Sequence, residues 1–233
     1  MTVTRGHASR ARDQAGAGTE VAEIASKVSR RDPDATRANI IEVATREFAE
    51  NGLDGARVDE IAEKTRTSKR MIYYYFESKE GLYKAVLENV YREIRTREAD
   101  LGLDKLAPEK ALRKLVESTV EYDDSRPHLF QLVSIENINY GRHVQTSPTI
   151  QTNNASATEI LRDILQRGAA EGVFRKNIDP TDLHMVISAL SLFRVSNRYT
   201  FGTIFGIDFS DPAVRRRHRK MIGDIVIRYV SPD

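Results

Sequence analysis

The chain has 233 residues, of which 36 are Lys or Arg and 34 are Asp or Glu, so its formal net charge is only +2 and any attraction for nucleic acid requires a local concentration of positive charge. Cysteine is absent, which excludes disulfides and thiolate metal sites, and no apolar run approaches the roughly 20 residues of a membrane helix, so we expect a cytoplasmic protein that contacts no membrane. The length allows one large or two small domains, and the few glycines and prolines (13 and 7) favour an all-α fold.

Residues 1–31 differ in composition from the rest of the chain. Small residues cluster at positions 15–18, and basic residues outnumber acidic ones. Two interpretations stay open at this point. The segment is either a flexible, solvated basic arm or a cationic arm that lies in the minor groove of DNA.

Three helices are predicted in the next segment, residues 32–78. Asp32-Pro33 combines an N-cap with proline at the first helical position, and Asn51-Gly52 is a left-handed stop. A second helix is expected from Val58 to Lys64, a turn at residues 65–67, and a third helix at residues 69–75 that Ser68 caps. Apolar residues at helical spacing would give the three helices a small common core: Ile41, Ala44, Phe48, Leu53, Val58, Ile61, Ile72 and Phe76.

Positive charge is concentrated in the second half of this segment. From Lys64 to Lys79 five residues are basic, and Glu77 is the only acidic one. A helical unit with one buried face and one cationic face suits DNA phosphates and base edges, and the major groove, about 12 Å wide, admits one helix. We therefore predict a helix-turn-helix DNA-binding domain, with candidate contacts from Arg57, Arg66, Thr67, Ser68, Lys69, Arg70, Met71 and Tyr74.

The run from Ile40 to Leu82 resembles the N-terminal domain of the TetR family of transcriptional regulators. Three motifs carry the resemblance: Phe48-x-x-x-Gly52, the pair Ile61-Ala62, and Ile72-Tyr73-x-x-Phe76-x-x-Lys79-x-x-Leu82. The resemblance implies an all-α homodimer on double-stranded DNA, with a C-terminal domain that binds a small effector and commonly releases a repressor from its operator. It also implies that Tyr73 and Lys79 contact phosphate. Together with two-fold symmetry, it leads us to expect an inverted-repeat operator.

The sequence departs from the family pattern around the turn. Arg66 stands where the family usually has glycine. If φ is positive there, the cost is roughly 1 to 2 kcal/mol, which a phosphate contact can offset or a rearranged turn can avoid. Arg70 and Met71 replace small residues, so Arg70 either reads guanine or contacts phosphate only, and Met71 can meet a thymine methyl group. Of Tyr74 and Tyr75, one ring is expected on the core and the other towards DNA.

The remaining residues, 79–233, are predicted to form a larger helical domain for ligand binding and dimerisation. A connecting helix starts at the cap Ser78 and runs along residues 79–100. Further helices are expected to begin at Pro108 and Pro127, then at Thr158 after a polar stretch from Gly141 to Asn154. The last two are expected to begin at Pro180 and at Asp211-Pro212.

The segment Ser134–Val144 is similar to a TetR subgroup that includes repressors of nicotinate and pyrimidine catabolism. We therefore expect a small organic effector, with an aromatic or heterocyclic acid as the guess, and no cofactor or metal. Polar anchors among apolar walls are typical of a ligand pocket, and the candidates are Tyr122, Phe130, Val133, Asn137, His143, Phe193 and Asn197. The alternative is that Glu136 and Asn137 cap or cross-link helices as satisfied polar groups.

The last two helices carry wide apolar stripes. One comprises Leu183, Val186, Ile187, Leu190 and Phe193, and the other Val214, Met221, Ile222, Ile225, Val226 and Tyr229. The stripes serve either the domain core alone or a four-helix homodimer contact. The basic run at residues 215–220 is either a solvated face or a second nucleic-acid surface.

Two other classes of function compete. For an enzyme, the five histidines show no metal-binding spacing, and no nucleophile elbow or phosphate loop is present. A TetR-like scaffold could also act as a ligand-dependent activator, or as an interaction protein without DNA binding. The retained Tyr73 and Lys79 and the local positive charge argue against the last.

Overall fold

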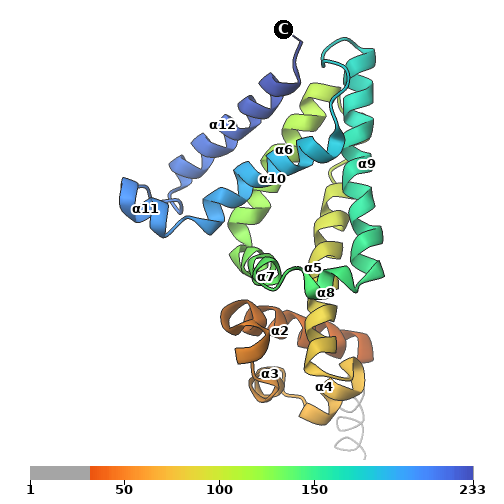
Figure 1. The fold of residues 1–233 in the computed structure, drawn as a ribbon, viewed down its shortest axis with the longest axis vertical. Helices are drawn as coiled ribbons and strands as arrows, with labels where there is room; N and C mark the ends of the chain where they lie inside the picture. Colours follow the sequence, from red (N-terminus) through yellow and green to blue (C-terminus); the bar gives the residue numbers. More distant parts are fainter. Residues whose placement is uncertain (1–31, 233) are drawn as a thin grey trace, which may run out of the picture.

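The computed structural model describes residues 32–232, apart from the side chains of residues 153–156. Every regular element in this part is helical, which confirms the all-α fold. The expectation of a basic arm falls on residues 1–31, outside the described residues. Figure 1 shows a small helical head at one end of the molecule and a larger helical body at the other, with one long helix reaching from head to body.

The head consists of α2 (Pro33–Gly55), α3 (Val58–Lys64) and α4 (Lys69–Phe76). Asp32 caps α2 as predicted, since its side chain accepts a hydrogen bond from the backbone N–H of Asp34 at 3.0 Å. Gly52 takes the expected left-handed φ of 68°, but it kinks α2 rather than ending it, and the last turn continues to Gly55. The bounds of α3 agree with the sequence, and α4 extends one residue further, to Phe76.

The long helix α5 (Lys79–Ala99) connects head and body. Ser78 caps it, accepting from the backbone N–H of Gly81 at 2.9 Å. Leu82, Tyr83 and Val86 are fully buried, and one hydrophobic cluster includes them together with Phe48 of the head and Leu132 of the body. The core of the head is therefore continuous with the lower end of the body, and α5 is held on both sides.

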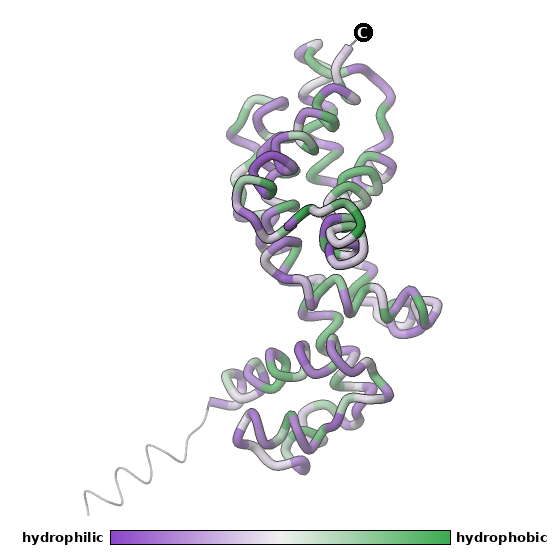
Figure 2. The backbone as a smooth tube through the Cα atoms, turned by 90° about the vertical axis from the view of Figure 1, so that its left-hand side faces the viewer, coloured by the Kyte–Doolittle hydropathy of each residue, from purple (hydrophilic) through white to green (hydrophobic). Residues whose placement is uncertain are grey.

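The body surrounds a second hydrophobic cluster. Its elements are a 3-10 turn η1 (Leu103–Lys105), α6 (Pro108–Ser125), α7 (Pro127–Ile138), α8 (Arg142–Gln145), α9 (Pro148–Ala170), α10 (Pro180–Ser196), α11 (Thr200–Phe205) and α12 (Pro212–Val230). Leu112 and Val116 of α6 pack there with Ile164 of α9, Leu183 of α10 and Val226 of α12. Figure 2 shows hydrophilic and hydrophobic residues alternating along these helices, as expected when each helix buries one face. No helix in the described part of the chain is long and apolar enough to cross a membrane.

Two expectations for the body were wrong. The polar stretch from Gly141 to Asn154 is mostly helical, because α8 lies within it and α9 begins at Pro148 rather than Thr158. Ser147 and Pro148 form a cap and a first helical position, and the Ser147 hydroxyl accepts from the backbone N–H of Ile150 at 3.3 Å. The short helix α11 was not predicted. It is fixed through Phe201, whose ring lies 5.4 Å from Phe193 and 6.1 Å from Phe209 between centroids.

Candidate functional site

One side of α4 is buried and the other is exposed. Ile72 and Phe76 are 0% and 5% exposed in the core of the head. Ser68 caps the helix by accepting from the backbone N–H of Met71 at 3.2 Å. The exposed side carries Lys69, Arg70, Met71, Tyr73 and Tyr74, so cationic, apolar and phenolic groups share one face of a helix at the end of the molecule.

The two neighbouring tyrosines differ in environment. Tyr74 is 77% exposed, whereas Tyr75 is half-buried and packs against the hydrophobic cluster of the head. The sequence could not assign these roles. The fold leaves Tyr74 as the ring that points to solvent.

The turn between α3 and α4 keeps the geometry of a glycine turn although it contains arginine. Arg66 has φ 52°, in the left-handed region that costs a non-glycine residue roughly 1 to 2 kcal/mol. The backbone N–H of Thr67 donates to the carbonyl of Ala62 at 3.0 Å, and the Thr65 hydroxyl donates to that of Ile61 at 2.7 Å. The surrounding bonds fix the turn in this conformation, and the exposed Arg66 lies beside α4.

A buried carboxylate, Glu47, fixes α3 relative to α2. It accepts from the backbone N–H of Arg57 at 3.2 Å, from the Asn51 amide at 3.1 Å and from the Lys64 ammonium at 3.0 Å. Burial on its own would raise the pKa of Glu47, but the bonds from Lys64, the Arg57 backbone and Asn51 outweigh burial and leave that pKa below its ordinary value. Glu47 was not among the predicted site residues, although a glutamate on the inward stripe of α2 is a usable signal.

The other predicted DNA contacts lie around α4. Arg57 is exposed and 3.6 Å from Glu60, and Lys69 pairs with Asp59 at 3.0 Å. Thr67 and Lys79 are half-buried, and the Lys79 ammonium donates to the carbonyl of Asp54 at 3.0 Å. All ten predicted residues therefore lie at the end of the head, either exposed or half-buried.

A cleft of about 500 Å³ beside this surface adds residues that sequence reasoning missed. Thr36 and Asn39 of α2 line it together with Lys64 and Arg66. Thr36 and Asn39 lie on the outward face of α2, so two polar side chains at i and i+3 were the available signal in the sequence.

The predicted effector residues are dispersed over α6, α7, α8 and α10. Tyr122 is buried, with the Arg97 guanidinium 4.7 Å from its ring centre, and Phe130 and Val133 are half-buried on α7. Asn137 is exposed and bonds within its own helix, donating to the carbonyl of Val133 at 2.8 Å. At the end of α10, Phe193 is 45% exposed and Asn197 donates to its carbonyl at 3.3 Å. None of these residues lines the two interhelical cavities described below.

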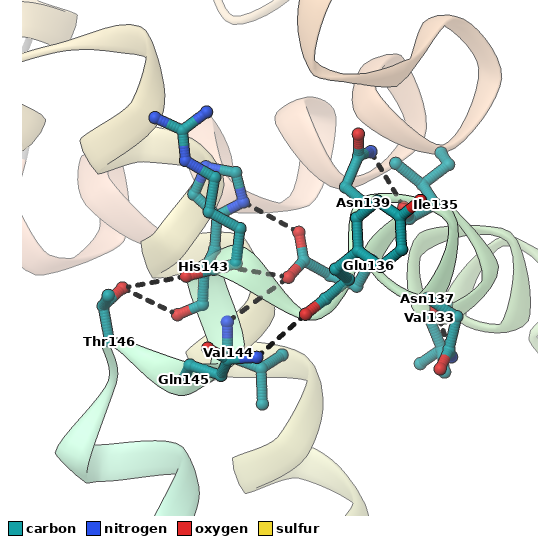
Figure 3. Close-up of polar contacts among 11 residues, drawn as sticks. Val133, Ile135, Glu136, Asn137, Asn139, His143, Val144, Gln145 and Thr146 are labelled. Atoms are coloured by element: carbon teal, nitrogen blue, oxygen red, sulfur yellow. Dashed lines mark hydrogen bonds and ion pairs between the residues drawn. The ribbon is translucent and has the colours of Figure 1, made fainter.

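His143 belongs to a polar cluster between α7 and α8 (Figure 3). Glu136 is 3% exposed and accepts three bonds: from His143 Nδ1 at 2.8 Å, from the His143 backbone N–H at 3.1 Å and from the Val144 backbone N–H at 3.3 Å. The imidazole packs edge-on against Tyr83, which packs in the same way on Phe48 of the head, at 5.0 Å in both cases. The cross-linking alternative for Glu136 is thus confirmed. We call Glu136 and His143 the α7–α8 clasp.

The interior of the body contains a second group of polar residues, which are half-buried. An enclosed space of about 10 Å³ lies between α5, α6, α9 and α10, with Glu98, Thr119 and His184 among apolar walls that include Leu115 and Ile187. Arg95 forms an ion pair with Glu98, and its Nε atom has no hydrogen-bond partner among the described residues. We call this space the body chamber.

Burial raises the pKa of Glu98 in the body chamber in spite of the neighbouring Arg95. It also raises the pKa of Tyr91, which lies one turn before Arg95 on α5. Burial also lowers the pKa of His184, and the nearby Arg95 lowers it further. Leu87, Tyr91 and Arg95 follow each other at helical spacing on α5. The charged residues Arg95 and Glu98 interrupt this apolar stripe, and that interruption was the signal in the sequence for a polar group inside the body.

A larger cleft of about 640 Å³ lies on one side of the junction between head and body. Glu42 and Arg46 of α2 face Glu93 of α5 and Arg126 and His128 at the corner between α6 and α7. The Arg126–Glu93 pair spans 2.9 Å and joins that corner to α5. Among residues 32–232 no group of three histidine or acidic side chains is arranged to hold a metal ion.

Comparisons with known proteins agree with this architecture. The family model "Bacterial regulatory proteins, tetR family" matches residues 40–86, and the model "Tetracyclin repressor-like, C-terminal domain" matches residues 108–226. The HTH-type transcriptional repressor NicS of Pseudomonas putida is 35% identical over 84% of this chain and 92% of its own length. The HTH-type transcriptional repressor SCO4008 of Streptomyces coelicolor is 30% identical over 71% of this chain and 81% of its own. The structure of the ketosteroid transcriptional regulator KstR2 of Mycobacterium tuberculosis has the same fold, with a TM-score of 0.62 at 20% identity over 84% of this chain and 95% of that one.

Proposed function

The chain belongs to the TetR family of bacterial DNA-binding transcriptional regulators, and we propose that it is a repressor that binds an inverted-repeat operator as a homodimer and is released by a small organic acid. The exposed face of α4 carries this proposal, because it combines arginine, lysine, methionine and tyrosine on a helix whose opposite face is buried. The relatives NicS and SCO4008, both named repressors, support the direction of regulation. Because the proposed protein acts on bacterial DNA, we place it in the cytoplasm.

Within the head we assign two kinds of contact. Arg70 and Met71, exposed in the first turn of α4, would meet base edges in the major groove. Tyr73, Tyr74, Lys79 and the residues of the α3–α4 turn would contact phosphates and so fix the register of the head on DNA. Within residues 32–232 the Lys79 ammonium donates one bond, to the Asp54 carbonyl, so it retains protons for a phosphate oxygen.

The dimer would form through α10 and α12. The two predicted stripes divide between two roles: Leu183, Ile187, Ile222 and Val226 are buried within the body, whereas others face solvent. The exposed apolar side chains on these helices are Met185, Phe193, Met221, Ile225 and Tyr229. Association of two copies would cover them and set the distance between the two α4 helices, which must match half-sites about one helical turn apart or a multiple of that.

For the effector we propose the body chamber, with an aromatic or heterocyclic acid as the ligand class. The Arg95 guanidinium and the His184 imidazole would bind the carboxylate, and the apolar walls would take the ring. Because burial raises the pKa of Glu98, that carboxyl takes up a proton more readily than an ordinary glutamate, and a ligand carboxylate can replace it beside Arg95. At about 10 Å³ the chamber is closed, so a ligand must part α5 from its neighbours. Movement of α5 would then alter the spacing of the two heads.

The DNA-binding proposal is tested with a mobility-shift assay and a footprint on the DNA upstream of the gene. We expect a protected site with inverted symmetry and a dimer by sedimentation. A monomer at micromolar concentration, or a protected site without inverted symmetry, contradicts the proposal. Binding that strengthens on ligand addition would favour the activator alternative, and a folded dimer that shifts no DNA would favour the interaction scaffold.

The effector site is tested by calorimetric titration with nicotinate and benzoate. Arg95→Met should abolish binding, whereas Arg92→Met, which changes an exposed arginine one turn earlier on α5, should leave it intact. The residues proposed from the sequence provide the rival location. If Phe130→Ala or Asn137→Leu removes binding and Arg95→Met does not, the chamber is the wrong site.

A further inference from the structure

The face of α12 that packs against α6 changes character along its length. Ile222, Val226 and Val230 are buried in the hydrophobic cluster of the body. Arg215 and Arg219 precede them at i, i+4 spacing on the same helical stripe. Towards its first turns α12 therefore presents guanidinium groups to α6 in place of apolar side chains.

A groove of about 350 Å³ lies between these first turns of α12 and the last turns of α6. Arg215, Arg216 and Arg219 line it from α12, and Glu121 and Asp124 line it from α6. We call it the arginine groove. Its walls lie in the body, at a distance from the exposed face of α4 (Figure 1).

The two carboxylates do not neutralise the three arginines. Asp124 is already paired with Arg194, a 4% exposed side chain that bonds it at 2.8 Å and whose Nη2 atom has no hydrogen-bond partner among the described residues. Glu121 is 66% exposed and 3.5 Å from Arg219, a surface pair that contributes little.

One further feature adds positive potential to the groove. Arg215 closes the first turn of α12, where the helix dipole favours anions. His218 next to it adds no charge, because burial and the nearby Arg194 and Arg217 lower its pKa.

We propose that the arginine groove binds a small, multiply charged anion through its phosphate or carboxylate groups. Three guanidinium groups on one wall can form paired, charge-assisted hydrogen bonds to such groups. The volume lies at the lower end of the range for small-molecule sites, which suits a compact metabolite rather than a nucleic-acid strand. The proposal stands independently of the operator and of the effector in the body chamber.

The experiment is calorimetric titration of the full chain with pyrophosphate and, separately, with citrate at constant ionic strength. We expect one site per chain for at least one of them. Binding of pyrophosphate alone identifies phosphate ligands, binding of citrate alone identifies carboxylate ligands, and binding of both identifies a general polyanion site.

Single substitutions locate the site. Arg215→Gln and Arg219→Gln should each weaken binding by about tenfold or more, since each removes charged hydrogen bonds. Arg217→Gln is the matched control, because it removes the same charge from the same turn without lining the groove. If thermal melting shows that Arg215→Gln disturbs folding through its bond to the Phe209 carbonyl, Arg216→Gln replaces it.

Three results would overturn the proposal. The first is that neither anion binds. The second is an equal loss of affinity in Arg217→Gln, which would indicate diffuse attraction to the basic run. The third is a random-sequence DNA duplex that displaces the anion from the wild type and binds less tightly to Arg215→Gln, which would make the groove a nucleic-acid surface.

Discussion

Replacement of Glu136 tests how much the α7–α8 clasp contributes to the stability of the fold. Its two carboxylate oxygens accept different hydrogen bonds. One accepts from the backbone N–H groups of His143 and Val144, and the other accepts from the imidazole Nδ1 of His143. Glutamine has the same shape. Its carbonyl oxygen can keep the two backbone bonds, and its amide can donate to a neutral imidazole. Leucine fills similar space but offers no acceptor.

The expected magnitudes follow from this division. Glu136→Gln loses only the charge assistance, so the free energy of unfolding should fall by about 1 kcal/mol. Glu136→Leu leaves two backbone donors and the imidazole without their acceptor at a site where Glu136 is 3% exposed. At about 1 to 3 kcal/mol for each backbone donor, we expect a loss of roughly 3 to 5 kcal/mol.

The assay is urea unfolding followed by circular dichroism, with Glu171→Gln as the control. Glu171 is exposed just after α9, so its substitution should change the free energy of unfolding by less than about 0.5 kcal/mol. Equal losses for Glu136→Gln and Glu136→Leu would refute the reasoning, because they would mean that charge rather than hydrogen-bond acceptance stabilises the clasp. A loss below 1 kcal/mol for Glu136→Leu would mean that the clasp is dispensable.

Four further outcomes are expected. Lys79→Ala should weaken binding to all DNA sequences and reduce the slope of log affinity against log salt by about one, as measured by fluorescence anisotropy. Arg70→Ala should instead relax the preference at one position in each half-site by about 1 to 3 kcal/mol, and an equal loss on every sequence would remove its base-reading role. Ile225→Asp, at a side chain that is 44% exposed, should shift sedimentation from dimer to monomer, and an intact dimer would place the interface elsewhere. Burial raises the pKa of Asp123 from 3.8 to about 6, so the folded state binds this proton more tightly and the free energy of unfolding falls as pH rises from about 4 to 6. Asp123→Asn should flatten this pH dependence and add up to about 3 kcal/mol to the free energy of unfolding at pH 7, whereas an unchanged pH profile would contradict the assignment.

The head could be predicted from the sequence because local signals determine it. Caps at Asp32, Ser68 and Ser78, with apolar spacing between them, fix where each helix begins and what it buries. Local signals could not show that α2 continues past Gly52, since a left-handed glycine either ends a helix or kinks it, depending on what packs afterwards. They also could not assign Tyr74 and Tyr75, whose environments depend on the rotation of α4 against α2 and α5.

The body was harder because its polar residues act over long separations. Sequence reasoning chose Asn137 and Asn197 as anchors because each interrupts an apolar helix, yet both satisfy their amides on the carbonyl one turn earlier. Arg95 was overlooked because a charged residue near the end of a helix usually faces solvent. The fold covers Arg95 together with its partner Glu98, and Glu98 in turn lines the body chamber with His184.

The same packing determines how binding of a ligand in the body would be transmitted to the head. α5 passes the body chamber at Glu98 and, about four turns earlier, contributes Tyr83 to the core of the head. The His143 ring holds Tyr83 from one side and Phe48 holds it from the other, both at 5.0 Å, so displacement of α5 must disturb either the clasp or the core of the head. Close-packed contacts of this kind change between discrete arrangements rather than deform continuously. An opened body chamber would therefore reset the angle of the head by a fixed step, and we expect that step to break the match between two α4 helices and two half-sites.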